Sequence, residues 1–364
     1  MNFTLVGVCV LTAVALLAAA IPWMSALGLM PAPTRRALPF YLGAILVAAF
    51  FGAFLGMLLT FSNDRATLGN WGRFVFSIMH LELGFDFFVL TLFVLLRVWP
   101  KGGAVAFAAF QEGLRQPTYW FVLIAGVVIM SFASILPFYT FGEDLKVLKE
   151  LCFVFSMMLP TLFGVLAASI SVTDEIEGRT AVTLMSKPIL RRDFLLGKFV
   201  GIGLAAMSMT IVLGWYLLWI VLFKDHIDPP LVPTVTPDPD WMASALALLG
   251  PGSAGDFVRG MLLWVSDASD ALPGLVIGYC QVSVLTALAV TLATRLPLLA
   301  NLVTCLVVYL LGHLTAVLTE ATATANPIIS FVAQAIDTGV PPLDTFDASQ
   351  AVIRDVPLPF LQYS

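Results

Sequence analysis

The sequence predicts an all-α protein whose chain crosses a membrane many times. Hydrophobic residues make up 60% of its 364 residues and charged residues only 11%, whereas a soluble domain carries about 25% charged residues. The mean hydropathy is +0.97, and apolar runs recur at about the 20-residue length that spans a hydrocarbon core. The net charge of −5 gives no basic surface for nucleic acid, so no such partner is expected.

About eight apolar runs are long enough to be transmembrane helices. They cover residues 3–28, 38–61, 76–98, 119–139, 150–171, 194–223, 272–294 and 297–318. Tryptophans lie at several of their ends, as the aromatic belt of a membrane interface predicts. The first run lacks the preceding basic residues of a signal peptide, so we interpret it as a retained helix.

Charge asymmetry between the loops predicts which side each loop faces. If the N-terminus lies outside, the inner loops hold most of the 18 Lys and Arg residues, and the outer loops hold most of the acids. Lys and Arg favour the cytoplasmic side, so we expect a multi-pass protein of the plasma (inner) membrane in this orientation. The loop at 172–198 is then cytoplasmic, and the long segments at 224–271 and 319–364 are outside.

A change in composition separates the first three spans from the rest. A Lys-Gly-Gly stretch at 101–103 breaks the third span, and Pro117 ends the segment that follows. Phe107 and Phe110 share one face of residues 104–116, which predicts an amphipathic helix in the membrane interface; a plain connector is the alternative. The expected domains are a three-span unit at 1–100, this amphipathic segment at 101–118, a core at 119–318 and an extracytoplasmic segment at 319–364.

The most informative stretch follows the fifth predicted span. Thr173 can cap a short helix over 174–186. The first turn of that helix would hold Asp174, Glu175 and Glu177, where the helix dipole favours acids. We therefore expect a rigid amphipathic helix that faces the cytoplasm.

Four basic residues follow this helix, between its end and the first turns of the next span. They are Lys187, Arg191, Arg192 and Lys198. A basic residue near an anionic leaflet is worth about 1 kcal/mol, so we expect these residues to anchor the loop at the membrane surface. A solvated loop helix with basic anchors and no further function is the alternative, and the physical pattern does not decide between the two.

This loop strongly resembles the cytoplasmic loop of ABC-2-type transporter permeases. The resemblance rests on Glu177-Gly178 with Thr180, on Leu184 with Ser186-Lys187-Pro188, on Arg191-Arg192 and on Gly197-Lys198. Two further segments are similar to parts of the same family. Glu112 to Pro117, with Arg115, looks like the elbow helix before the first core span, and Arg295 to Pro297 looks like a turn between two core spans. The resemblance covers about residues 104–318.

The resemblance implies that the chain is the permease subunit of an ABC transporter, with export as the expected direction. It implies a coupling helix at 174–186 that contacts a separate ATPase subunit through Asp174, Glu175, Glu177, Gly178, Arg179 and Thr180. The chain has no G-x-x-x-x-G-K-[ST] loop, so ATP would bind to that partner; we expect neither a cofactor nor enzymatic activity in this chain. A second permease copy or a related permease is the other expected protein partner, beside the lipid bilayer.

Some features depart from the family pattern or favour other functions. The family core has six spans, whereas five follow the elbow segment here, so a further span after residue 364 is expected.

A non-transporting anchor or assembly factor with a permease fold remains open. A membrane-embedded enzyme that uses His80, Glu82 and Asp86 has less support. We interpret His313 and the four cysteines as packing residues, and we expect no metal site.

Overall fold

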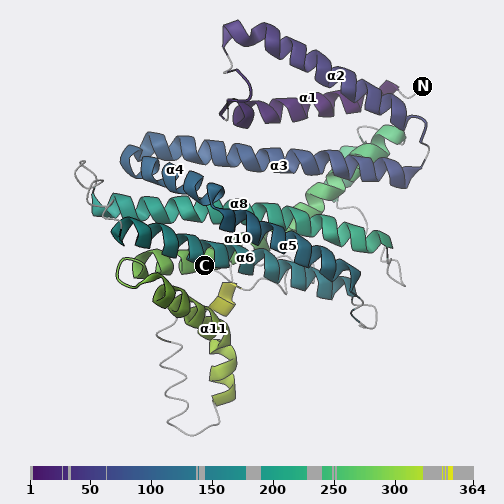
Figure 1. The fold of residues 1–364 in the computed structure, drawn as a ribbon. Coiled ribbons are helices and arrows are strands. Elements are labelled where there is room, and N and C mark those ends of the chain that lie inside the picture. The colour runs from purple at the N-terminus through teal and green to yellow at the C-terminus, as the bar shows by residue number, and fades with distance from the viewer. Residues whose placement is uncertain are drawn as a thin grey trace. The chain divides into compact units, whose positions relative to one another are not determined.

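The computed structural model describes most of the chain as helix (Figure 1). The described residues are 3–26, 28–31, 34–62, 64–136, 138, 144–177, 190–227, 240–247, 250, 252–322, 338, 341 and 343–346. Every regular element among them is helical, which confirms the predicted all-α class. Most of the predicted extracytoplasmic segment at 319–364 lies outside these residues.

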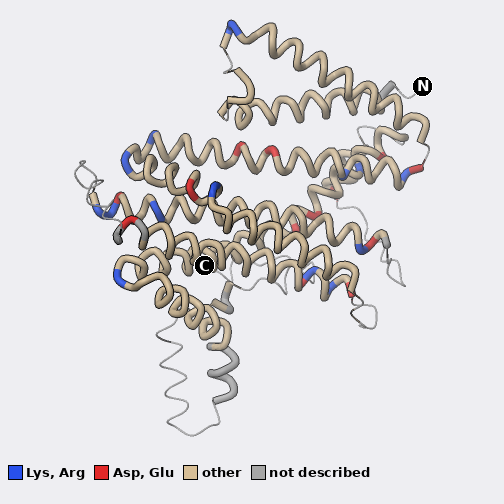
Figure 2. Tube along the Cα trace, in the orientation of Figure 1, with Lys and Arg blue, Asp and Glu red and all other residues tan. Residues whose placement is uncertain are grey.

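The helices follow the predicted order of spans. They are α1 (Phe3–Ala26), η1 (Arg35–Ala37), α2 (Leu38–Leu59), α3 (Arg65–Val98), α4 (Pro100–Arg115), α5 (Pro117–Ile135), α6 (Asp144–Glu177), α8 (Arg191–Ile227), α9 (Asp240–Ala247), α10 (Ser253–Leu292), α11 (Leu298–Thr322) and η2 (Leu343–Phe346). Within the described residues, charged residues lie mostly near helix ends, and the middle of α3 is an exception because it contains acidic residues (Figure 2).

Six of these helices are long and apolar enough to cross a membrane. They are α1, α2, α5, α6, α8 and α10. Helix α3 is not among the six, and the apolar part of α11, Leu298–Leu314, falls in a shorter class. The multi-pass character is therefore supported, while the expected number of about eight spans is supported only as far as these six helices.

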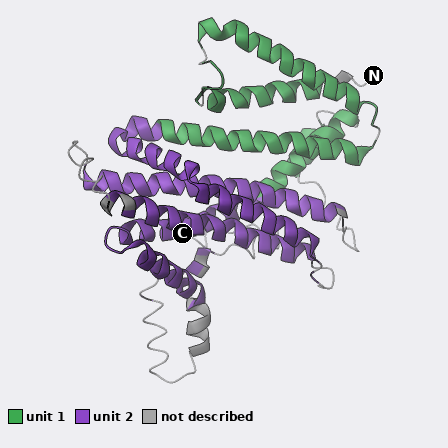
Figure 3. Cartoon of the chain, in the orientation of Figure 1, with its two compact units in different colours: residues 1–93, 232–269 green, residues 94–231, 270–364 purple. Residues whose placement is uncertain are grey.

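The chain forms two compact units (Figure 3). Unit 1 contains residues 1–93 and 232–269, and unit 2 contains residues 94–231 and 270–364. The chain changes unit three times. The changes at 93/94 and 269/270 fall inside continuous helices, α3 and α10, and the change at 231/232 lies outside the described residues. The segment at 232–269, which the sequence placed in an outer loop of the core, thus groups with the N-terminal helices.

In unit 1, α1 and α2 form an antiparallel pair through glycines one helical turn apart. A Cβ atom at Gly52 would lie 2.6 Å from the carbonyl oxygen of Cys9, and one at Gly56 would lie 2.7 Å from the Cα of Val6. Glycines at this spacing allow two backbones to approach closely in a membrane. The same unit has a small core of Leu5, Cys9, Leu59, Leu68, Val75, Ala254 and Phe257.

The first half of α10 packs against α3 in unit 1. A Cβ atom at Gly72 would lie 2.0 Å from the Phe257 carbonyl oxygen, so the two backbones are in direct contact there. The ion pair Arg65–Asp256 joins the same two helices. The helix that contains the predicted span at 272–294 therefore begins earlier, at Ser253. Pro273 lies inside this helix; a transmembrane helix tolerates proline when neighbouring groups satisfy the freed backbone carbonyl.

In unit 2, α4 packs lengthwise on the first turns of α8. A Cβ atom at Gly197 would lie 2.8 Å from the Gly102 carbonyl oxygen, one at Gly201 would lie 2.3 Å from the Ala106 carbonyl oxygen, and one at Gly113 would lie 3.0 Å from the Cβ of Ala205. The contacts advance in the same order along both helices. Helix α4 therefore runs along the first turns of α8, and its expected position in the membrane interface stays a prediction.

The break between α3 and α4 falls at Trp99, before the predicted break at 101–103. Pro100 opens α4 at a position that favours proline, because the first helical residue needs no N–H partner. Gly102 and Gly103 lie inside α4 and are buried. These glycines provide close contact between helices where the sequence suggested a chain break.

Candidate functional site

The loop that carries the family resemblance connects α6 and α8. Helix α6 ends at Glu177 and α8 begins at Arg191. Gly178, Arg179, Thr180 and Lys187 lie outside the described residues, as do the side chains of Asp174 and Glu177. Their expected roles in ATPase contact and anchoring stay predictions, and the site described here is the base of this loop.

Helix α6 continues through Thr173 to Glu177, so the expected helix cap at Thr173 does not form. Residues 165–177 contain neither glycine nor proline, and nothing in their backbone preferences ends the helix. Asp174, Glu175 and Glu177 therefore lie in the last turn of a long helix, where the helix dipole disfavours acids. A nearby cation would offset this cost.

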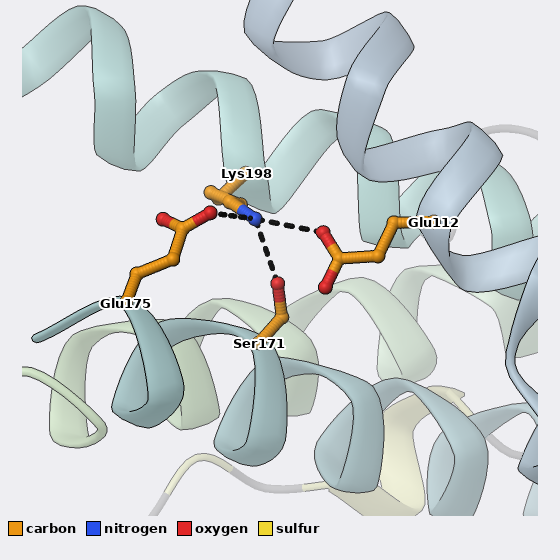
Figure 4. A network of polar contacts seen from close by, with 4 residues as sticks. All are labelled: Glu112, Ser171, Glu175 and Lys198. Atoms are coloured by element: carbon orange, nitrogen blue, oxygen red, sulfur yellow. Dashed lines mark hydrogen bonds and ion pairs between the residues drawn. The ribbon is translucent and has the colours of Figure 1, made fainter. Parts of the chain in front are cut away.

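Lys198 of α8 supplies that cation (Figure 4). Its Nζ lies 2.7 Å from Glu175 Oε1 of α6 and 2.9 Å from Glu112 Oε2 of α4, and it donates a hydrogen bond of 2.7 Å to Ser171 Oγ of α6. An ammonium group has three donors, and here all three have partners. The Lys198 side chain is only 5% exposed, so the residue expected at the membrane surface is a buried connection between three helices.

The exposure of the two carboxylates differs. The Glu112 side chain is 42% exposed and that of Glu175 is 23% exposed. Water therefore reaches the Glu112 pair more easily than the Glu175 pair, and the Glu175 pair is less screened. The ammonium offsets the unfavourable position of Glu175 at the helix end, and it contacts both carboxylates at the same time.

A second polar contact connects the start of α8 to the junction of α3 and α4. Trp99 donates a hydrogen bond from Nε1 to Asp193 Oδ1 at 3.1 Å. Asp193 is buried, and the Arg192 Nε atom lies 3.9 Å from the same oxygen. Arg191 and Arg192 are exposed, as their expected role as anchors requires.

A third polar group holds the end of α6 to the α10–α11 turn. The buried Asn301 donates hydrogen bonds from Nδ2 to Ser169 Oγ at 2.9 Å and to the Ala289 carbonyl oxygen at 3.0 Å. Ser169 precedes Ser171 by two residues on α6. The last turns of α6 thus contact α11 on one side and Lys198 on the other.

The remaining elbow residue, Arg115, is exposed at the end of α4. The next turn is held by a hydrogen bond of 3.0 Å from Trp120 Nε1 to the Leu114 carbonyl oxygen. The pairing of Glu112 with Lys198 was not predicted. The available signal was a lysine at the start of an apolar run, because such a charge is rarely buried without a partner.

The residues of the rival enzymatic interpretation lie elsewhere, on α3 in unit 1. Trp264 donates a hydrogen bond from Nε1 to His80 Nδ1 at 3.3 Å, and Glu82 and Asp86 lie one turn apart on α3. His313 contacts the Tyr309 carbonyl oxygen and the Gln281 amide. Among the described residues, no three His, Cys, Asp or Glu side chains are grouped to hold a metal ion.

Comparison of the chain with protein-family models, curated proteins and solved structures finds no match. The functional argument therefore starts from the motif residues and from the contacts at the base of the α6–α8 loop.

Proposed function

We propose that this chain is the membrane subunit of an ABC transporter, with the ABC-2-type core expected from its loop motif. Its ATPase would be a separate polypeptide. The observation that carries the proposal is the position of Lys198, which pairs with Glu175 and Glu112 at the base of the loop where the motif predicts ATPase contact. A loop that receives force needs such connections to the helices below it.

In this proposal the chain performs a mechanical task. Closure of the ATPase pushes on the loop between α6 and α8 and displaces the ends of both helices. Helix α6 has 34 residues and α8 has 37, so each is about 50 Å long, against a hydrocarbon core of about 30 Å. The loop ends of these helices can therefore extend beyond the bilayer toward a partner and still move the spans within it.

Helix α4 takes part in the same movement. Its glycines contact the α8 backbone directly, and Glu112 adds an ion pair to Lys198. Tightly packed elements shift together because interiors resist local deformation. The proposed complex also has a second permease subunit, an N-terminus outside and export as its direction, as the sequence predicts.

The test is co-expression with an ATPase subunit, followed by purification and a transport assay in proteoliposomes. Glu177→Lys should weaken ATPase binding, because reversing a charge at a contact surface can cost several kcal/mol. Glu150→Lys is the matched control, since Glu150 is exposed in α6 far along the helix from the loop. We expect ATP-dependent transport to fall for Glu177→Lys and to persist for Glu150→Lys.

Two outcomes would count against this function. Equal transport by both variants would show that Glu177 and its loop do not contact the ATPase. A chain that binds the ATPase without any ATP-dependent transport would instead be the non-transporting anchor or assembly factor.

A further inference from the structure

Three exposed arginines lie within two residues of Trp99 or Asp193 in the chain. Arg97 is in the last turn of α3, and Arg191 and Arg192 begin α8. Trp99 lies two residues after Arg97, and Asp193 follows Arg192 directly, so the 3.1 Å bond between Trp99 and Asp193 brings the three arginines into one region. We define Arg97, Arg191, Arg192 and Trp99 as the arginine cluster.

The cluster has a fixed frame. A Cβ atom at Gly102 would lie 2.0 Å from the Trp99 indole, so only glycine at this position leaves room for the ring. The Gly102 carbonyl oxygen in turn contacts Gly197 of α8. The indole is therefore held between the start of α4 and the start of α8. These contacts fix the backbone segments that carry the arginines relative to each other.

Three acids of this part of unit 2 have partners among the described side chains. Asp193 accepts the Trp99 hydrogen bond, and Glu112 and Glu175 pair with Lys198. The three arginines therefore supply exposed positive charge among the described side chains of this region. A guanidinium group presents a planar pair of donors that matches the oxygens of a phosphate.

Exposed apolar side chains directly adjoin the arginines. Val94, Leu96 and Val98 are exposed on the last turns of α3, and Leu190 and Leu196 are exposed at the start of α8. A free inorganic anion would gain nothing from such neighbours, whereas a lipid offers a phosphate beside acyl chains. Basic side chains at the edge of an apolar surface are typical of contact with anionic lipid.

We propose that the arginine cluster binds the headgroup of an acidic phospholipid, with the acyl chains against the exposed apolar side chains at the end of α3 and the start of α8. This site does not require the ATPase partner and would exist whether or not the chain transports a substrate.

The test uses the purified full-length chain in detergent micelles with added phosphatidylglycerol or phosphatidylcholine. Bound lipid is measured by native mass spectrometry, and stability by thermal unfolding. We expect phosphatidylglycerol to remain bound and to raise the unfolding temperature. The triple variant Arg97→Gln, Arg191→Gln, Arg192→Gln should bind it about tenfold more weakly or worse, because each basic residue near an anionic headgroup contributes.

The matched control removes three exposed arginines elsewhere, as Arg36→Gln, Arg115→Gln, Arg295→Gln, and should keep the binding. Trp99→Phe should also weaken binding, since it removes the indole donor while all three arginines remain. Equal loss in the control would show diffuse attraction, and equal stabilisation by inorganic phosphate would show a free-anion site; either result overturns the proposal. Unchanged binding in Trp99→Phe would refute the arrangement around the indole.

Discussion

Lys198 shows how one buried charge depends on its surroundings. Its ammonium has partners on α4 and α6, and two of them are carboxylates. Glu175 is an acid at a helix C-terminus, and Glu112 is a half-exposed acid on a helix packed through glycines. Removing the cation therefore affects two carboxylates at once.

We predict that Lys198→Met lowers the free energy of unfolding by about 2 kcal/mol. Breaking a fully buried pair costs about 3–5 kcal/mol, and the partial exposure of Glu112 and Glu175 reduces that value. Unfolding of the detergent-solubilised protein by a denaturing detergent measures the change. The control is the triple variant Lys198→Met, Glu112→Gln, Glu175→Gln, which removes all three charges and should recover most of the loss. A single variant as stable as the original would contradict the role given to Lys198.

Asp64 provides a pH-dependent contact at the start of α3. Its carboxylate accepts hydrogen bonds from the Thr67 hydroxyl at 2.8 Å, the Thr67 N–H at 3.1 Å and the Ala66 N–H at 3.3 Å. The Thr67 side-chain bond, followed by the two backbone bonds, lowers the pKa of Asp64 below its usual 3.8. A folded-state pKa below the unfolded value means that the stabilisation is present above pH 3.8 and disappears as the pH falls through the lower folded value.

We therefore predict that the first turn of α3 opens more readily as the pH falls below 3.8 and through the folded-state pKa of Asp64. Hydrogen exchange of the amides at 65–69, corrected for intrinsic rates, should show this loss of protection in the original protein. Asp64→Asn keeps a good cap without a titrating group, so its protection should vary less with pH. Identical pH profiles for the two proteins would exclude Asp64 as the cause.

At the scale of single helices, the glycines of α4 and α8 have a structural role. We predict that Gly201→Ala destabilises the protein by about 1–3 kcal/mol, the usual cost of inserting atoms into a filled contact. The new Cβ atom would lie 2.3 Å from a backbone oxygen of α4, and a backbone atom cannot rotate away. Thermal unfolding in detergent measures the effect.

The control for this change is Gly43→Ala in α2. A Cβ atom there would meet nothing within 4 Å, and alanine is a better helix former than glycine by up to about 1 kcal/mol. Its stability should be unchanged or higher. If both alanine variants behaved alike, the close α4–α8 contact would not determine stability.

The sequence predicted the existence of the helices better than their ends. Apolar length alone indicates a span, and each predicted span overlaps a helix. The ends of α6 and α10 were missed because polar residues continue a helix when neighbouring helices satisfy them, as Lys198 does for Glu175. The sequence predicts a helix break at Gly102 and Gly103, because a sequence does not show that another backbone lies against these glycines.

At the scale of the whole molecule, the charge distribution predicts opposite sides for the two ends of α8. Arg192 lies at its first end and Asp225 near its second, and both are exposed. We predict that, in whole cells, a membrane-impermeant thiol reagent labels Asp225→Cys but not Arg192→Cys. The unmodified chain, with its four native cysteines, gives the background. The reverse pattern would invert the proposed orientation.

The candidate site was only partly predictable at this scale. The motif located the loop, and two of the four expected anchors, Arg191 and Arg192, are exposed. The contacts of Lys198 with Glu112, and of Asn301 with Ser169, join residues that are far apart in the chain. No spacing rule gives such pairs, because they depend on how separate helices pack.

The discontinuity of unit 1 has a consequence for biogenesis. Helices α1 and α2 can associate through Gly52 and Gly56 as soon as both have left the ribosome. Their core partners Leu68 and Val75 on α3 follow directly, whereas Ala254 and Phe257 on α10 are synthesised only after α4, α5, α6 and α8. The early hairpin must therefore persist in the bilayer as an unfinished intermediate while most of the other unit is inserted. The direct packing of the α1 and α2 backbones gives this intermediate a defined geometry until α10 is inserted.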